Sequence, residues 1–160
     1  MQQFPYESSA QFRERLHNQL PDVGVTDFNK DHQQFLDHLI KFHELVEKDS
    51  KKIPLAKDWK LIEETVNFLN RYAKNHFDAE EKLMVKYSFV KLDSHAQEHR
   101  ECIVRIDDLK NNLIIKKEIL YIVDLKFYML EWLFHHIKNV DMEYKPFFKE
   151  RLSAKKFRSK

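Results

Sequence analysis

The chain has 160 residues, which is enough for one domain with a sizeable hydrophobic core. A single glycine and four prolines leave little material for the tight turns of sheet folds, so the composition favours long helices. With 28 lysines and arginines against 26 aspartates and glutamates, the formal net charge is +2, which excludes the strongly basic surface of a nucleic-acid-binding domain.

An N-terminal arm precedes the periodic part of the chain. The segment SSAQFRERL predicts a short helix capped by Ser8 or Ser9, and Pro21 and Gly24 then mark an irregular stretch. Basic residues dominate the other end of the chain, where seven lysines and arginines and one glutamate follow from Lys145 onward. We therefore divide the chain into an arm at 1–22, a helical domain at 23–143 and a basic tail at 144–160.

Four long runs between these ends repeat apolar or histidine side chains in steps of three and four, which keeps them on one helix face. The first run begins near Asp31, the second follows the N-cap Asp58 and extends to Tyr87, the third starts at Leu92, and the fourth ends at His136. The sequence therefore predicts an all-α, up-down-up-down four-helix bundle with an N-terminal arm and a short basic C-terminal extension.

Seven histidines and carboxylates fall on the apolar faces of these four helices or directly after them. Titratable groups that point into a core are costly unless something satisfies them. Alternate helices of the bundle run in opposite directions. The seven residues lie near the start of the first and third helices and near the end of the second and fourth, so all of them meet at the same end of the bundle. This grouping predicts a metal site, and its residues are His32, His76, Glu80, His95, His99, His136 and Asp141.

The local spacing agrees with this site except at one position. His76 and Glu80, like His95 and His99, are four residues apart, about one helical turn on the same face. Asp141 follows His136 by five residues, which a regular helix would rotate about 140° away from the face. We therefore expect the helix to end, loosen or form a π-bulge between Ile137 and Asp141.

The ligand types select the metal. Five imidazoles and two carboxylates are too many for one tetrahedral zinc and too rich in nitrogen for calcium or magnesium. Imidazole with carboxylate suits iron among a few transition metals, and two carboxylates can bridge two ions. More imidazole and fewer anionic ligands than in ferritin-like proteins favour the ferrous state, and hence reversible O2 binding over oxygen activation.

Four stretches of the chain resemble the bacterial hemerythrins (bacteriohemerythrins) of the hemerythrin family. They are VGVTDFNKDHQQF at 23–35, NHFDAEEKLM at 75–84, HAQEH at 95–99 and WLFHHIKNVD at 132–141. The resemblance implies that one iron is held by three histidines, and that a second iron, with an open position for O2, is held by two. Glu80 and Asp141 would bridge the ions beside an oxo or hydroxo group. The three histidines are His95, His99 and His136, and the two are His32 and His76.

The chain departs from the family pattern at three positions, none of which is a ligand. Asn29 replaces the usual aspartate three residues before the first ligand, His17 stands where a tryptophan is common, and Ser88 replaces a proline. Other titratable side chains are expected to lie outside the metal site, with Glu81 open between a solvated and a metal-site role. The expected non-ligands are His17, His38, His43, His135 and Cys102.

The function expected from this reading is non-enzymatic: reversible O2 binding for storage, transport or delivery at two non-heme, oxo- or hydroxo-bridged irons. The alternatives are a sensor of O2, redox state or iron that acts through an unknown protein partner, an enzyme that handles peroxide or nitric oxide, and iron storage. A single cysteine and the lack of any apolar run near the roughly 20 residues of a membrane span predict a cytoplasmic protein without a transmembrane segment. We expect a monomer or weak oligomer, with no nucleic-acid binding. The basic tail is expected to be solvated, and the alternative is that it contacts an anionic membrane surface, nucleic acid or a protein partner.

Overall fold

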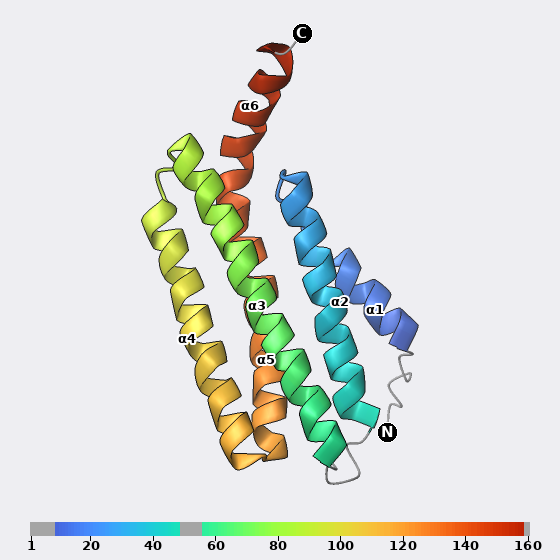
Figure 1. Cartoon of the computed structure of the whole chain (residues 1–160). Coiled ribbons are helices and arrows are strands. Elements are labelled where there is room, and N and C mark those ends of the chain that lie inside the picture. The colour runs from blue at the N-terminus through green and yellow to red at the C-terminus, as the bar shows by residue number, and fades with distance from the viewer. Residues whose placement is uncertain (1–8, 49–55, 159–160) are drawn as a thin grey trace, which may run out of the picture.

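The computed structural model describes residues 9–48 and 56–158, and this part of the chain is helical apart from short connections (Figure 1). Its α-helices pack as the sequence predicts: α2 contacts α3 and α5, α4 contacts the same two helices, and α1 lies against α2. The all-α bundle is therefore confirmed. The helices are α1 (Ser9–Asn18), α2 (Thr26–Lys48), α3 (Ala56–Tyr87), α4 (Leu92–Lys116), α5 (Ile119–His136) and α6 (Met142–Arg158), with a π-helical segment η1 (Ile137–Asp141) between α5 and α6.

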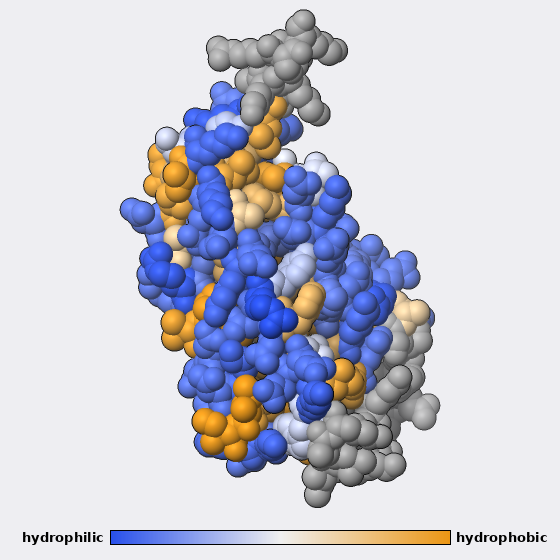
Figure 2. Space-filling view, viewed as in Figure 1, coloured by the Kyte–Doolittle hydropathy of each residue, from blue (hydrophilic) through white to orange (hydrophobic). Residues whose placement is uncertain are grey.

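The core of the bundle is formed by the apolar faces that the sequence periodicity indicates. On α2, Leu36, Leu39 and Phe42 are fully buried, and Val66 and Leu69 of α3 are equally inaccessible. Full burial of a side chain of this size contributes about 1.5–3 kcal/mol to stability. The opposite faces are polar, and Figure 2 shows mostly hydrophilic side chains over the outer surface of α3.

The loop between α1 and α2 sets the position at which α2 begins. Gly24 has a φ of +81°, a conformation that favours glycine, and a Cβ there would lie 3.1 Å from the Cγ of Lys145. The side chain of Asn29 accepts a hydrogen bond from the Val23 N–H at 2.9 Å and donates one to Asp22 at 2.6 Å. Asn29 therefore fixes the loop ahead of the first predicted ligand.

The C-terminal segment continues the fourth helix of the bundle beyond the predicted boundary at residue 143. η1 and α6 follow α5 without a break, and α6 extends past the end of the bundle (Figure 1). Tyr144 and Phe148, which the sequence analysis assigns to the tail, are completely buried. The beginning of the basic segment is therefore part of the core.

The connections at both ends of α4 are short. Ser88 has a φ of 55°, and Lys117 ends α4 with a φ of 49°. No helix in the described ranges combines the length and apolarity that crossing a membrane requires.

Candidate metal centre

All seven predicted ligand residues meet in one buried cluster. Glu80 and Asp141 have no exposed surface, and the five histidines are at most 9% exposed. The helices contribute them in the predicted order: α2 supplies one histidine, α3 a histidine and a glutamate, α4 two histidines, and α5 with η1 the last histidine and aspartate. Five elements thus bring residues more than 100 positions apart in the sequence to one place.

The histidines form two groups, and within each group the ring nitrogens face one another. The Nε2 atoms of His32 and His76 are 2.9 Å apart, and those of His99 and His136 are 3.1 Å apart. Metal–nitrogen bonds of about 2.1 Å at a right angle would separate two nitrogens by about 3.0 Å. The observed spacings therefore suit ligands in adjacent positions around one ion.

Glu80 lies between the two groups and directs one oxygen to each. Its Oε1 is 3.5 Å from the Nε2 of His76 and 3.9 Å from that of His32. Its Oε2 is 3.5 Å from the Nε2 of His95 and 3.4 Å from that of His99. A carboxylate in this position can bind two metal ions at once.

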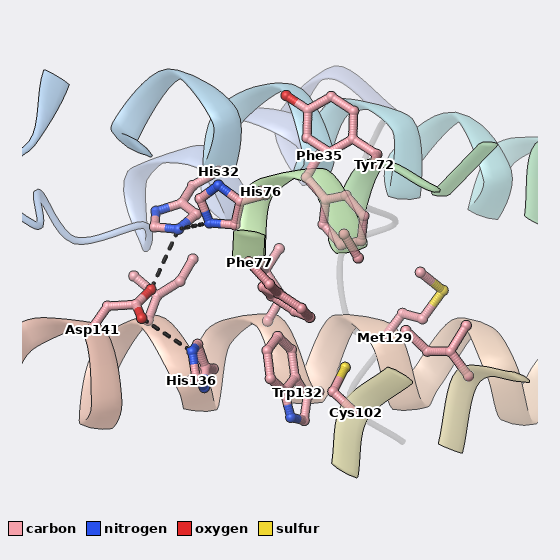
Figure 3. Close-up of a pocket in the computed structure, with 14 residues that line it drawn as sticks. His32, Phe35, Tyr72, His76, Phe77, Cys102, Met129, Trp132, His136 and Asp141 are labelled. Atoms are coloured by element: carbon pink, nitrogen blue, oxygen red, sulfur yellow. Dashed lines mark hydrogen bonds and ion pairs between the residues drawn. The ribbon is translucent and has the colours of Figure 1, made fainter. Parts of the chain in front are cut away.

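Asp141 repeats this arrangement. Its Oδ2 is 3.3 Å from the Nε2 of His32, while its Oδ1 is 3.1 Å from that of His136 (Figure 3). The same Oδ1 is 3.4 Å from the Nε2 of His95. Both Asp141 oxygens, together with Oε2 of Glu80 and Nε2 of His95, are buried without a hydrogen-bond partner. Each such atom costs roughly 1–3 kcal/mol, and more when charged, unless a metal or another partner satisfies it.

The backbone irregularity predicted before Asp141 is present. Residues Ile137–Asp141 form a π-helical turn, and the N–H of Met142 bonds to the carbonyl of Ile137 five residues earlier. A π-turn adds a residue to one turn of the helix and returns Asp141 to the face of His136. This prediction is confirmed, and a regular helix with Asp141 in solvent is excluded.

Carboxylates on neighbouring helices hold the second nitrogen of two histidines. The Nδ1 of His76 lies 3.2 Å from Oδ2 of Asp31, and the Nδ1 of His99 lies 2.8 Å from Oε1 of Glu81. A carboxylate partner at Nδ1 fixes the tautomer and ring orientation of a metal-binding histidine. Glu81, whose role the sequence left open, therefore contacts the site, and each histidine group has one such support.

Sequence reasoning missed two residues of the site, Asp31 and Tyr144. The hydroxyl of Tyr144 donates a hydrogen bond of 2.7 Å to Oε1 of Glu80. Asp31 and Glu81 share one detectable signal, since each is adjacent in sequence to a predicted ligand but supports a histidine of another helix. Tyr144 follows Asp141 by three residues and therefore lies on the same helix face.

Burial and mutual repulsion keep two of the imidazoles neutral. Burial, with the nearby His76, lowers the pKa of His32 to about 3, and burial beside His99 lowers that of His136 well below its usual value. Neutral imidazoles have the free lone pair that a metal requires. Lone pairs at these positions are therefore available at neutral pH without loss of a proton.

The pKa values of the two carboxylates shift in opposite directions. Burial would raise the pKa of the Glu80 carboxyl, but His76 and the other facing histidines hold it well below its usual range. Burial and the charge of Glu80 raise the pKa of Asp141 well above its usual range. A metal that binds both carboxylates would therefore release the proton of Asp141.

Aromatic rings and an apolar cavity surround the cluster. Trp132 stacks on His136 with ring centres 4.3 Å apart, and Phe77 stacks on His99 at 3.9 Å. Beside them lies a cavity of about 20 Å³, lined by predicted ligands and by side chains such as Phe35 and Met129 (Figure 3). A space of this size holds about one small molecule.

The remaining histidines lie outside the cluster, as expected. His17 contacts Asp37 at 3.1 Å, His38 packs on Phe68, and His43 packs on Phe12. His135 is exposed. Cys102 is buried and lines the apolar cavity.

Comparison with known proteins places the chain in the family that the sequence resemblance indicates. The model of a family described as "Hemerythrin HHE cation binding domain" matches residues 23–148. The chain is 24% identical over 123 residues to "Bacteriohemerythrin" of Clostridium acetobutylicum, a match that covers 77% of this chain and 92% of that protein. It is 35% identical over 71 residues to a hemerythrin subunit of Sipunculus nudus, covering 44% of this chain and 53% of that protein. The chain matches no solved structure.

Proposed function

The chain belongs to the hemerythrin family, and from this premise we propose that it binds O2 reversibly at a pair of non-heme iron ions. One observation carries the proposal: Glu80 and Asp141 each direct one oxygen to each of two histidine groups. A single ion would need only one of the two histidine groups. Two ions that share both carboxylates would bind the three carboxylate oxygens that lack a hydrogen-bond partner, Oε2 of Glu80 and both oxygens of Asp141.

We assign the ligands according to these groups. His95, His99 and His136 would hold one ion, and His32 and His76 would hold the other. Glu80 and Asp141 would contribute an oxygen to each ion, beside an oxo or hydroxo group from solvent. The group with two histidines offers fewer ligands, so O2 would bind at its ion. When bound, a pair of ferrous ions would supply the electrons for O2 binding.

The chain's own residues prepare the site for this chemistry. Asp31 and Glu81 hold the rings of His76 and His99 so that their Nε2 atoms face the cluster interior. Tyr144 donates to Glu80 and leaves the other carboxylate oxygen free to face the second histidine group. These contacts reduce the reorganisation that metal binding requires.

The apolar cavity favours O2 among the candidate ligands. Its lining includes Phe35, Phe77, Met129 and Leu133, and it reaches the cluster at His32, His76, His136 and Asp141. An uncharged diatomic molecule enters such a space without losing hydrogen bonds, whereas an ion must shed its water. The same lining would limit contact between water and the iron pair.

We propose a non-enzymatic carrier or store of O2, and the single buried cysteine fits a cytoplasmic location.

The test is an optical titration of the anaerobically reduced, iron-loaded protein. We expect a visible absorption band that appears when O2 is added and disappears when O2 is removed, over repeated cycles. Immediate irreversible oxidation would contradict a carrier and favour a sensor or an enzyme.

Iron counting tests the ligand assignment separately. His76→Ala should reduce bound iron from two ions per chain to one, because it removes a histidine from the smaller group. His38→Ala is the matched control, since His38 lies on a bundle helix but packs against Phe68 outside the cluster. Two irons at full affinity in His76→Ala would show that the assignment is wrong.

A further inference from the structure

The apolar cavity beside the histidines has two lining side chains that reach the surface. Of the 14 residues that line it, all but Tyr72 and Trp132 are buried (Figure 3). A route between solvent and the cavity therefore leads past one of these two rings.

Trp132 is held in place by ring contacts. It stacks on His136 with centres 4.3 Å apart and planes inclined by 15°, and it packs on Phe77 at 5.2 Å. Both neighbours are buried, and His136 is also close to Asp141. Displacement of Trp132 would break a stacked contact with a predicted ligand.

Tyr72 is held in place by hydrogen bonds of its hydroxyl group. Its Oη donates to Oε1 of Gln34 at 2.9 Å and also lies 3.3 Å from Oδ1 and 3.4 Å from the carbonyl oxygen of Asp31. Tyr72 belongs to α3, whereas both partners belong to α2. These contacts therefore close the seam between the two helices next to the cavity.

The same contacts reach the metal cluster. While Oδ1 of Asp31 faces Tyr72, its Oδ2 lies 3.2 Å from the Nδ1 of His76. Burial and the nearby Asp31 charge raise the pKa of Tyr72 to about 12, so the hydroxyl stays protonated and remains a donor at neutral pH.

We propose that Tyr72 is the access gate of the cavity: its hydroxyl, held by Gln34 and Asp31 of α2, keeps the ring over the entrance, and its release admits a small uncharged molecule. That this molecule is O2 rests on the proposed function. A gate changes how fast a ligand enters and leaves without changing the bound state. Loosening Tyr72 therefore raises the rates of binding and release by the same factor and leaves the affinity unchanged.

Two variants loosen the gate without removing the ring. Tyr72→Phe deletes only the hydroxyl, and Gln34→Leu deletes its nearest acceptor. Tyr121→Phe is the matched control, because the Tyr121 hydroxyl contacts Lys116 at the turn between α4 and α5, away from the cavity.

The first measurement needs no iron. Cys102 is the only cysteine and lines the cavity, so its labelling by the small uncharged reagent methyl methanethiosulfonate reports entry into the metal-free protein. We expect labelling to be roughly two- to tenfold faster in Tyr72→Phe and Gln34→Leu, the range of one net hydrogen bond. Cys102 is also labelled whenever the whole protein unfolds. Urea unfolding of the same samples gives the rate of this contribution, which is subtracted from the measured labelling rate.

The second measurement is stopped-flow O2 binding and release by the iron-loaded protein. Both rates should rise by a similar factor in the two variants and stay unchanged in Tyr121→Phe. If Tyr72→Phe and Gln34→Leu show the same labelling and O2 rates as Tyr121→Phe, the gate proposal is wrong. It is also wrong if the two variants are labelled faster but bind and release O2 no faster. If the parent protein shows no reversible O2 binding, the proposed function fails, while the labelling experiment still decides whether Tyr72 gates the cavity.

Discussion

The substitution Tyr144→Phe tests how the buried carboxylates are stabilised. Tyr144 is fully buried, and its hydroxyl donates a 2.7 Å hydrogen bond to Oε1 of Glu80. Its ring packs against Phe148 and Phe28, with centres 5.2 Å and 6.2 Å away. Phenylalanine retains these ring contacts, so the substitution removes one hydrogen bond and little else.

The expected loss follows from the charge of the acceptor. The facing histidines hold the pKa of Glu80 well below its usual range against the effect of burial, so Glu80 is anionic at neutral pH. Hydrogen bonds to charged groups contribute about 1.5–3 kcal/mol. Without the hydroxyl, Oε1 is left with His76 at 3.5 Å and His32 at 3.9 Å. We expect the metal-free protein to lose about 2 kcal/mol of unfolding free energy.

Urea unfolding followed by circular dichroism at pH 7 measures this loss, provided that both proteins unfold with the same m-value. Tyr121→Phe is the control, because its hydroxyl is at the surface and its removal should cost less than about 0.5 kcal/mol. A loss of less than about 0.5 kcal/mol in Tyr144→Phe would refute the reasoning, since it would mean that Glu80 carries no charge in the folded metal-free protein.

Three further predictions concern the supports of the site, the predicted ligand His32 and the loop before α2. Asp31→Asn and Glu81→Gln should each weaken iron binding roughly 10- to 100-fold in a chelator competition, and unchanged affinity would contradict their role in orienting histidines. Because the folded chain lowers the pKa of His32 from 6.5 to about 3, its contribution to stability is present above pH 6.5 and is lost towards pH 3. Between pH 3 and pH 6.5, the unfolding free energy of the metal-free protein should increase with pH. His32→Asn should lower the slope of this increase by about 1.4 kcal/mol per pH unit. Gly24→Ala should cost about 1–2 kcal/mol in urea unfolding, because alanine disfavours the positive φ and meets Lys145; an unchanged midpoint would contradict this.

The core helices were predictable because helical periodicity is a local property of the sequence. The predicted start of the third bundle run, Leu92, is also the first residue of α4, and the second run ends with α3 at Tyr87. The tail was less predictable. Its basic composition, averaged over all faces of the helix, conceals Tyr144 and Phe148, which the structure buries.

The candidate ligands could be found from residue type and spacing, whereas their supports could not. Asp31 contacts a histidine of α3 and Tyr144 contacts a glutamate of α3. Both contacts depend on the distance and rotation between helices, which a single sequence does not specify. Glu81 shows the same limit, since its place beside Glu80 was visible but its contact with His99 of α4 was not.

The π-turn accounts for the tail and for the site together. Relative to His136, a regular helix would place Asp141 about 140°, Tyr144 about 80° and Phe148 about 120° around the axis, at roughly 100° per residue. One extra residue in a turn takes back about 100°, which leaves the three at about 40°, −20° and 20°. All three then share the face of His136, in agreement with their burial. The apolar face thus resumes its steps of three and four after a single step of five, and this phase shift is a signal that a sequence can show. It brings the Asp141 carboxylate to the cluster and, by the same rotation, the Tyr144 hydroxyl that donates a hydrogen bond to Glu80.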